Sequence, residues 1–154
     1  MDDASAVEVI EAGIEDKPIV GQLLELYLHD FSVFTDADVD AGGRFGYDYL
    51  DAYWSEPERV PFLLRVDGRW AGFALVRTGV PHDLAEFFVM RKYRRRGVGI
   101  AAARELFARL PGEWQVRQMR ANVDASAFWR RAIPVAFVEE EIEAGPDQRF
   151  TMPR

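Results

Sequence analysis

The sequence predicts an α+β fold (α/β in the broad sense) in which helices cover one mixed but mainly antiparallel sheet. The chain has 154 residues, 49% of them hydrophobic, and this length favours one domain with one core. Apolar patterns follow the order strand, one or two helices, three strands, helix, strand, helix, two strands. Asp67-Gly68 separates two apolar runs, which indicates a tight antiparallel hairpin. We therefore expect a single domain over residues 1–154, with six or seven strands and about four helices.

The first half of the chain supplies a strand, a helix and a loop. Residues 7–10 read as a strand, and Asp16 with Pro18 marks the start of a helix. Apolar residues then recur at helical spacing, namely Val20, Leu23, Leu24, Tyr27, Leu28 and Phe31. Residues 32–46 are acidic and contain glycine, so we expect a loop there, followed by a short aromatic helix at 47–54.

The second half supplies the rest of the sheet and two further helices. We expect strands at 62–66, 70–77, 84–90 and 114–119, and a last pair at 135–138 and 149–152. One helical stripe consists of Ile100, Ala103, Phe107 and Leu110, and a second of Ala125, Phe128, Trp129 and Ala132. Pro111-Gly112 ends the first helix and Pro134 ends the second.

Composition and charge exclude several classes of protein. Cysteine is absent, which excludes disulfides and thiolate metal sites and agrees with a cytoplasmic protein, and we expect no bound metal. Apolar runs are too short to cross a bilayer, so we expect no membrane partner. A formal charge of −7 argues against general nucleic-acid binding. The only lysines are Lys17 and Lys92 among many arginines, a bias that favours a bacterial, GC-rich source.

Positive charge is concentrated in one short segment. Five of the six residues at 91–96 are basic, whereas 14 basic residues face 26 acidic ones in the rest of the chain. A compact positive spot on an acidic protein suits a small ligand that carries phosphate. RNA binding through this segment is an alternative, and it predicts an affinity that falls steeply with salt.

The basic segment joins a buried strand to a helix. Residues 94–100 read RRRGVGI, so Gly97 and Gly99 stand where an apolar helix begins. Helix N-termini present unpaired N–H groups and a partial positive charge, and glycine lets a ligand approach the main chain. Neighbouring arginines add charge-assisted hydrogen bonds to phosphate oxygens. We interpret this segment as a pyrophosphate cradle.

Two other interpretations of these glycines stay open. Gly97, Gly99 and Ala102 match the dinucleotide fingerprint G-x-G-x-x-A, but there the strand runs almost directly into the first glycine. Here seven residues lie between Val89 and Gly97, and a hairpin precedes the unit. The second alternative is an ordinary glycine-containing helix start beside a solvated run of charge.

A second motif lies on the next strand–helix unit. Residues 122–129, NVDASAFW, begin a helix 23 residues after Gly99. Together with RRRGVG at 94–99, this segment resembles the paired motifs (Q/R)-x-x-G-x-(G/A) and N-x-x-A-x-x-(F/L)-Y of the GNAT acetyltransferase superfamily. The matching motifs lie between about Glu86 and Ile133, and the order of elements agrees over most of the chain. The resemblance implies a GNAT-like fold and direct transfer of an acetyl group from acetyl-CoA to a primary amine.

The resemblance also implies which residues contact acetyl-CoA. The pantetheine arm would lie along Val89, with Phe87 and Phe88 beside it, although at least one phenylalanine is expected to pack in the core. The pyrophosphate would be held largely through backbone N–H groups of the cradle, whose residues are Arg94, Arg95, Arg96, Gly97, Val98, Gly99 and Ile100. Asn122 would contact the coenzyme near its pantetheine end, and Trp129 occupies a further coenzyme position of the family.

For catalysis, the resemblance implies a neutral amine that attacks the thioester. The backbone N–H of Val89 would stabilise the developing oxyanion. Glu86 is the first choice for the base, because a carboxylate on an otherwise apolar strand next to the pantetheine site needs a reason. A solvent-exposed edge position is the alternative for Glu86. Secondary candidates are His82, Asp83, His29 and Asp30.

Two departures from the family pattern weaken the catalytic assignment. Trp129 replaces the tyrosine that often protonates the leaving thiolate, and indole is not a usable acid. Either the thiolate departs without that acid, or Tyr47 or Tyr49 reaches over from the substrate loop. The usual Gly-aromatic pair is replaced by Ile-Pro-Val at 133–135. A non-catalytic acyl-CoA-binding module of the same fold is therefore the alternative function.

The acetyl acceptor would be selected by residues 31–54. Aromatic residues there line a pocket or pack the core, namely Tyr47, Tyr49, Tyr53 and Trp54. The acidic balance outside the cradle favours a cationic acceptor, either a small molecule or a peptide amine. A homodimer is one assembly that the resemblance allows.

Overall fold

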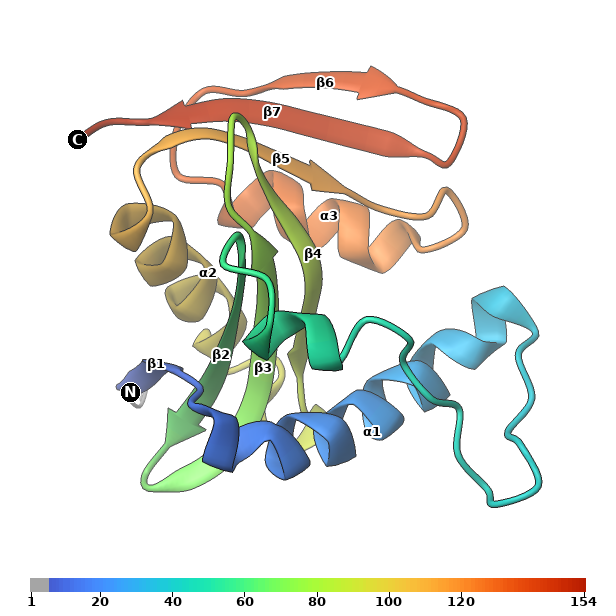
Figure 1. Ribbon diagram of the computed structural model, residues 1–154. Helices are drawn as coiled ribbons and strands as arrows, with labels where there is room; N and C mark the ends of the chain where they lie inside the picture. The colour runs from blue at the N-terminus through green and yellow to red at the C-terminus, as the bar shows by residue number, and fades with distance from the viewer. Residues whose placement is uncertain (1–5) are drawn as a thin grey trace.

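The structure is a computed structural model that describes residues 6–154, and its strands form one seven-stranded sheet (Figure 1). The strands are β1 (Val7–Glu11), β2 (Arg59–Val66), β3 (Arg69–Arg77), β4 (His82–Val89), β5 (Gly112–Arg117), β6 (Val138–Glu141) and β7 (Pro146–Met152). Their order across the sheet is β1-β2-β3-β4-β5-β7-β6. Every neighbouring pair is antiparallel except β4 and β5, which are parallel. The predicted mixed, mainly antiparallel sheet is confirmed.

Three α-helices and three 3₁₀ turns complete residues 6–154, where the sequence predicted about four helices. They are η1 (Ile14–Asp16), α1 (Lys17–Thr35), η2 (Asp51–Trp54), η3 (Arg91–Tyr93), α2 (Val98–Arg109) and α3 (Val123–Ala132). The expected helix at 47–54 is wrong over its first half, because only Asp51–Trp54 closes a 3₁₀ turn. None of the described helices is long and apolar enough to span a membrane.

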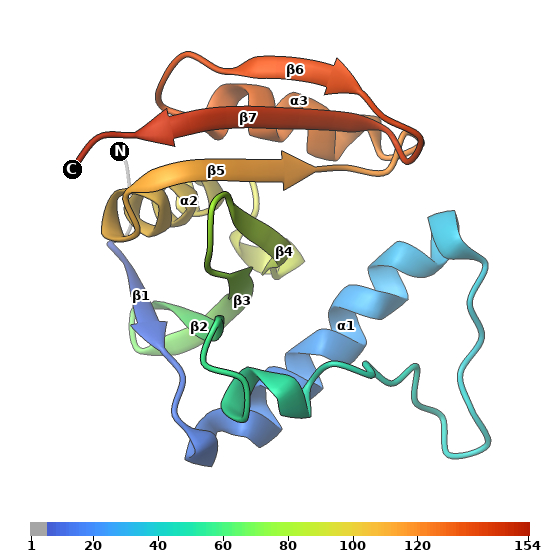
Figure 2. The same cartoon turned by 45° about the horizontal axis from the view of Figure 1, so that its top comes forward.

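The helices cover the sheet in two layers, as both views show (Figures 1 and 2). On one face, α1 packs its apolar stripe against β2, β3 and β4, with Leu24, Phe73 and Phe88 buried together. On the other face, α2 and α3 pack over the sheet around Phe107, Trp114 and other buried residues. The helical periodicity read from the sequence therefore identified both layers of the core.

The hairpin between β2 and β3 confirms the turn at Asp67-Gly68. Both turn residues have positive φ, 51° and 76°, as a two-residue hairpin of this kind requires. The expected strand at 135–138 is wrong. Val135 and Phe137 pack against the core without strand pairing, and the last antiparallel pair begins only at Val138. The strand that forms is exposed and acidic, so apolar patterning could not identify it.

Candidate active site

The sheet opens at the middle of β4. Parallel pairing between β4 and β5 covers only His82, Asp83 and Leu84, opposite residues 114–116. Beyond Leu84 the two strands run in different directions (Figure 1). At the same point the register against β3 shifts, since Leu75 pairs with Glu86 and Val76 with Leu84. Ala85 is thus the extra residue of a β-bulge, a device that often re-aims side chains beside active sites.

The backbone of Val89 lies on the edge of β4 that is no longer paired with β5. Met90 donates its N–H to Ala71 of β3 over 2.8 Å. Because successive residues of an antiparallel strand alternate in the side to which their N–H and C=O groups point, the N–H and C=O of Val89 point away from β3. This edge can hydrogen-bond an extended polar chain that lies beside it.

The turn after β4 has the backbone shape of an anion-binding site. Arg95 and Gly97 adopt left-handed conformations, with φ of 62° and 78°, and such alternations turn successive N–H groups into one concavity. α2 then begins without a side-chain cap, and its first internal bond runs from Ala101 N–H to Gly97 C=O. The N–H groups of its first turn, at residues 98–100, therefore lie ahead of the helical hydrogen bonds.

The two glycines of this turn serve different purposes. Gly97 has the positive φ, and a Cβ added to it would meet nothing within 4 Å. A Cβ on Gly99 would lie 3.0 Å from Cε1 of Phe128 and 3.6 Å from Cγ2 of Val89. Gly97 thus leaves space open at the cradle, whereas Gly99 lets α2 pack closely against α3 and β4.

The basic residues of the turn divide into two groups. Arg91 and Arg94 both bind the carboxylate of Asp30 on α1, over 2.9 and 2.7 Å. Arg95 and Arg96 are exposed, and neither forms an ion pair within residues 6–154. Lys92 is also exposed and forms no ion pair within residues 6–154, so the positive charge available to a ligand comes from Lys92, Arg95 and Arg96.

The carboxylate of Glu86 accepts hydrogen bonds from two tyrosines. Tyr27 donates its hydroxyl to Oε1 over 2.6 Å, and Tyr47 donates to Oε2 over 3.0 Å. Burial raises the pKa of Glu86 above 4.5, against the hydrogen bonds from Tyr27 and Tyr47, which lower it. Burial and the neighbouring Glu86 raise the pKa values of both tyrosines, which keeps them protonated donors. The alternative of a freely solvated Glu86 is therefore wrong.

Tyr27 is a residue of the candidate site that sequence reasoning missed. It lies in the apolar stripe of α1 and is 8% exposed, so its spacing indicates only a core residue. It contacts Phe73 and Phe88 edge-on, as a core ring does. The hydroxyl nevertheless meets a carboxylate 59 positions away, a contact for which the sequence carries no local signal.

The secondary base candidates are held in other interactions. Asp83 accepts a hydrogen bond from Arg117 over 2.8 Å and is buried. Nδ1 of His82 accepts a hydrogen bond from the Gly79 N–H, and its Nε2 donates to the carbonyl oxygen of Pro111. His29 is exposed on α1, and Asp30 is bound by arginines. Among these carboxylates, Glu86 is the one that follows the bulge and contacts both α1, through Tyr27, and the segment between α1 and η2, through Tyr47.

The remaining predicted coenzyme residues lie around the second motif. The side chain of Asn122 caps α3 by accepting the N–H of Ala125 over 3.2 Å. Trp129 is buried and packs edge-on against Phe87 at 5.0 Å between ring centroids. Phe88 is buried on the α1 face, as predicted for at least one of the two phenylalanines. The half-buried Phe87 packs on the opposite face, next to Phe128.

The arrangement fits an elongated ligand that carries a diphosphate. The cradle supplies backbone N–H groups at Gly97 and the α2 start, the β4 edge supplies the polar groups of Val89, and Glu86 lies three residues before that edge. Within residues 6–154 no three His, Asp or Glu side chains are arranged to hold a metal ion.

Comparisons with known proteins agree with this geometry. A family model described as the acetyltransferase (GNAT) family matches residues 21–133. None of the curated proteins compared matches the chain in sequence. An acetyltransferase from Thermus thermophilus has a similar structure, with a TM-score of 0.72, 15% identity and coverage of 97% of both chains.

Two further solved structures share the fold. The ribosomal-protein-S18-alanine N-acetyltransferase of Escherichia coli has a TM-score of 0.69 at 15% identity, over 97% of this chain and 96% of that one. The PaiA N-acetyltransferase of Thermoplasma acidophilum, solved in complex with coenzyme A, has a TM-score of 0.64 at 12% identity, over 95% of this chain and 99% of that one.

Proposed function

Because this chain belongs to the acetyltransferase (GNAT) family, we propose that it transfers an acetyl group from acetyl-CoA to a primary amine. The observation that carries the proposal is the coincidence of three features at one edge of β4. These are the cradle at residues 94–100, the open edge at Val89 and the carboxylate of Glu86. Acetyl-CoA supplies the activated acyl group as a thioester.

The cradle and the β4 edge bind the coenzyme. The N–H groups of residues 97–100 donate to the pyrophosphate, and Arg95 and Arg96 add charge-assisted hydrogen bonds. The C=O of Val89, which also accepts a hydrogen bond from Arg94, pairs with the pantetheine arm, and the half-buried Phe87 supports the arm from one face. The side-chain amide of Asn122 lies at the start of α3. Its Oδ1 caps the helix, and its NH₂ group donates a hydrogen bond to the coenzyme.

Glu86 removes the proton of the acceptor amine, directly or through water. Its pKa is raised by burial, which brings the carboxylate closer to the working pH that a general base needs. As the C–N bond forms and the C–S bond breaks, Val89 N–H stabilises the negative charge on the carbonyl oxygen. Tyr47, whose hydroxyl contacts Glu86, donates a proton to the departing thiolate. Glu86 then passes to Tyr47 the proton that it took from the amine.

The acceptor approaches from the segment between α1 and η2. This segment contains Asp36, Asp38, Asp40 and Asp48 against a single Arg44. Glu25 of α1 accepts the N–H groups of Phe45 and Gly46 over 2.7 and 2.9 Å, which fastens the segment to α1 just before Tyr47 reaches Glu86. The negative charge supports a cationic amine as acceptor.

The decisive experiment combines coenzyme binding with turnover. Acetyl-CoA should raise the melting temperature of the wild-type protein, and an amine panel should reveal acceptor-dependent release of CoA. Gly97→Val should abolish the thermal shift by acetyl-CoA, because the β-branched side chain strains a left-handed φ and covers the cradle.

Gly68→Val is the matched control for this variant. Gly68 has φ of 76° and equally open surroundings, but it lies in the β2–β3 turn. The Gly68→Val variant should have a lower melting temperature than the wild type, but acetyl-CoA should still raise that temperature. Tight coenzyme binding without turnover of any amine would favour the non-catalytic module, which the buried Trp129 in place of a tyrosine supports. Absence of binding would refute both.

A further inference from the structure

A single carboxylate links helix α1 to the turn that follows β4. Asp30 accepts a hydrogen bond from Arg91 at Oδ1 over 2.9 Å and one from Arg94 at Oδ2 over 2.7 Å. Burial alone would raise the pKa of Asp30, but the hydrogen bonds from Arg94 and Arg91 outweigh it and lower the pKa. The Asp30 side chain is 23% exposed, whereas those of Arg94 and Arg91 are 41% and 75% exposed, so the carboxylate is the best shielded part of this bridge.

Arg94 makes a second contact that leads to the reacting edge. Its Nε donates to the carbonyl oxygen of Val89 over 2.7 Å, while its terminal nitrogen binds Asp30. The guanidinium also lies over the Phe88 ring, 5.7 Å from the centroid. Because a guanidinium is rigid and planar, fixing one side of it on Asp30 fixes the direction in which its Nε meets the Val89 peptide.

The same helix also holds the proposed base. Tyr27 lies three residues before Asp30 on α1, so the two side chains share one face of the helix. Tyr27 binds Glu86, and Asp30 reaches Val89 through Arg94. One helix therefore sets the position of the general base and of the strand edge that carries the oxyanion donor.

We propose that Asp30 is a positioning residue of the acetyl transfer, which holds the carbonyl of Val89 through Arg94 and so fixes the Val89 backbone, including the N–H in the preceding peptide unit, relative to Glu86. This inference rests on the proposed function. It assigns Arg91 and Arg94 of the basic turn to α1, and leaves Lys92, Arg95 and Arg96 as the side chains that attract the phosphates.

The test variant is Asp30→Asn, measured in steady-state turnover and in acetyl-CoA binding by calorimetry. Loss of the carboxylate loosens the Val89 peptide, so kcat should fall about tenfold, as expected for a small misplacement of a catalytic group. It also frees two guanidinium groups beside the cradle, so the Kd for acetyl-CoA should stay the same or decrease. A merely structural role for Asp30 would weaken binding and turnover together.

Glu8→Gln is the control, because Glu8 also forms a two-contact pair with an arginine, Arg65, but on the far edge strand β1. Its kcat and coenzyme Kd should match the wild type. If Asp30→Asn leaves kcat unchanged, or if it lowers kcat and weakens acetyl-CoA binding to the same extent, the inference is wrong.

A double-mutant cycle separates the two arginines. Arg94→Lys keeps the charge but cannot bind Asp30 and Val89 at once, so its effect on kcat should not add to that of Asp30→Asn. Arg91→Lys has no contact with Val89 and should alter kcat little. Additive losses for Asp30→Asn and Arg94→Lys would overturn the relay. If wild-type protein neither binds acetyl-CoA nor acetylates an amine, the proposed function itself fails, a result distinct from any of these.

Discussion

Two glutamates, Glu86 on β4 and Glu139 on β6, show how the same side chain is prepared for different tasks. Glu86 is partly buried between α1 and the sheet and receives hydrogen bonds from two neutral tyrosine hydroxyls. Glu139 lies on an exposed edge strand and receives two hydrogen bonds from Arg130 of α3, over 2.9 and 2.8 Å, and one from Gln148 of β7.

The pKa values of the two carboxyls are displaced in opposite directions. The hydrogen bonds from Arg130 and then Gln148 lower the pKa of Glu139 to about 2. Burial raises the pKa of Glu86, and neutral donors only partly offset it. A carboxylate with a cationic partner stays ionised and joins elements together, whereas one surrounded by neutral donors is able to exchange a proton.

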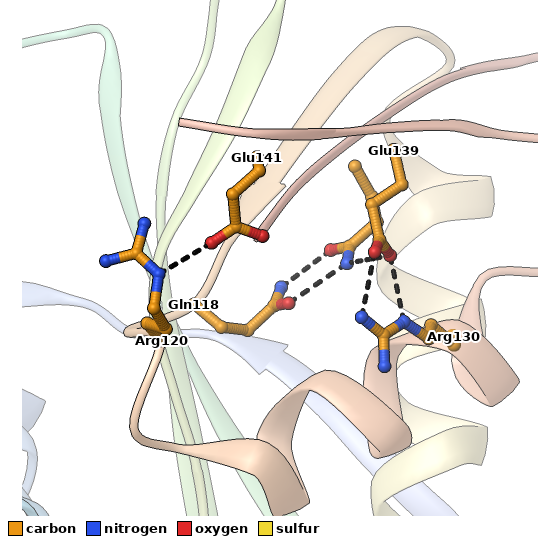
Figure 3. Close-up of polar contacts among 6 residues, drawn as sticks. Gln118, Arg120, Arg130, Glu139 and Glu141 are labelled. Atoms are coloured by element: carbon orange, nitrogen blue, oxygen red, sulfur yellow. Dashed lines mark hydrogen bonds and ion pairs between the residues drawn. The ribbon is translucent and has the colours of Figure 1, made fainter. Parts of the chain in front are cut away.

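Glu139 belongs to a polar network that fastens the β5–β7–β6 side of the sheet (Figure 3). Gln118 and the fully buried Gln148 exchange two amide hydrogen bonds, over 2.6 and 3.0 Å, and Gln148 continues to Glu139. Arg120 binds Glu141 over 2.8 Å at the other end. This side of the sheet is stabilised by paired amides and ion pairs next to its apolar core, whereas on the α1 face the carboxylate of Glu86 is paired with two tyrosine hydroxyls.

The largest expected effect comes from replacing each of the two glutamates with glutamine in a separate variant. Glu86→Gln should lower kcat/KM for amine acetylation about 10²- to 10⁴-fold at neutral pH, because it removes a general base, while the Kd for acetyl-CoA stays unchanged. Glu139→Gln should leave kcat/KM unchanged. Equal activity of wild type and Glu86→Gln across the pH range would remove the functional difference between the two residues.

The next effect concerns the stability of the network. Gln148→Leu leaves the amide of Gln118 buried without its partner, and the free energy of unfolding should fall by about 1–3 kcal/mol in urea titrations. The double variant Gln118→Leu/Gln148→Leu removes both amides and should recover part of the loss. If the double variant loses more free energy of unfolding than the two single variants lose together, this account is wrong.

The tyrosines should set the acid limb of the pH–rate profile. Because the ionised form of Glu86 is the proposed base, kcat/KM should rise as pH rises through its pKa. Tyr27→Phe or Tyr47→Phe removes one donor to the carboxylate, which should raise that pKa by up to about one unit and move the limb to higher pH. An acid limb that stays in place in both variants would show that Glu86 is not the titrating group.

The smallest effects are expected in stability as a function of pH. The Glu139 carboxyl has a folded pKa of about 2 against 4.5, so its contribution is present above pH 4.5 and is lost as pH falls towards 2. Glu139→Gln should therefore cost about 1 kcal/mol near neutrality, a value limited by solvent screening, and nothing near pH 2.

Glu86 should behave in the opposite way. Its folded pKa is raised, so ionisation disfavours the folded state, and stability falls as pH rises from 4.5 through the folded pKa. Glu86→Gln should match or exceed the wild type in stability above that window. Thermal unfolding from pH 2 to pH 8 measures both trends, and parallel curves for the two variants would contradict the comparison.

The features that could be predicted from the sequence are those whose conformation depends on residues close together in the chain. The hairpin at Asp67-Gly68 and the glycine turn at residues 94–100 follow from local backbone needs, and both form as expected. Glu86 stood out because it interrupts an apolar strand. Tyr27 did not, and Asp30 was named only as a secondary base candidate, because their partners lie 59 and 64 positions away and only the packing of α1 on the sheet brings them together.

The edge of the sheet shows a different limit. Apolar residues at 135–138 predicted a strand, but β6 consists of Val138 and three glutamates whose side chains are exposed or bound to arginines. Charged edge strands prevent association with other sheets, and such a strand has no apolar alternation to detect. Arg94 was predicted to contact the coenzyme, whereas it binds Asp30 together with Arg91.

The bulge at Ala85 decides on which side of the molecule the chemistry is placed. Leu84 belongs to the core beneath α2 and α3, whereas Phe88 belongs to the core beneath α1. Strict alternation would put positions 84, 86 and 88 on one face, so the additional residue turns Glu86 across the sheet towards Tyr27 and the acceptor segment. If Ala85 were instead an ordinary paired residue of the ladder, Glu86 would share the face of Leu84 in the layer of Trp129 and Phe107, and the amine and its proposed base would lie on opposite sides of the same strand.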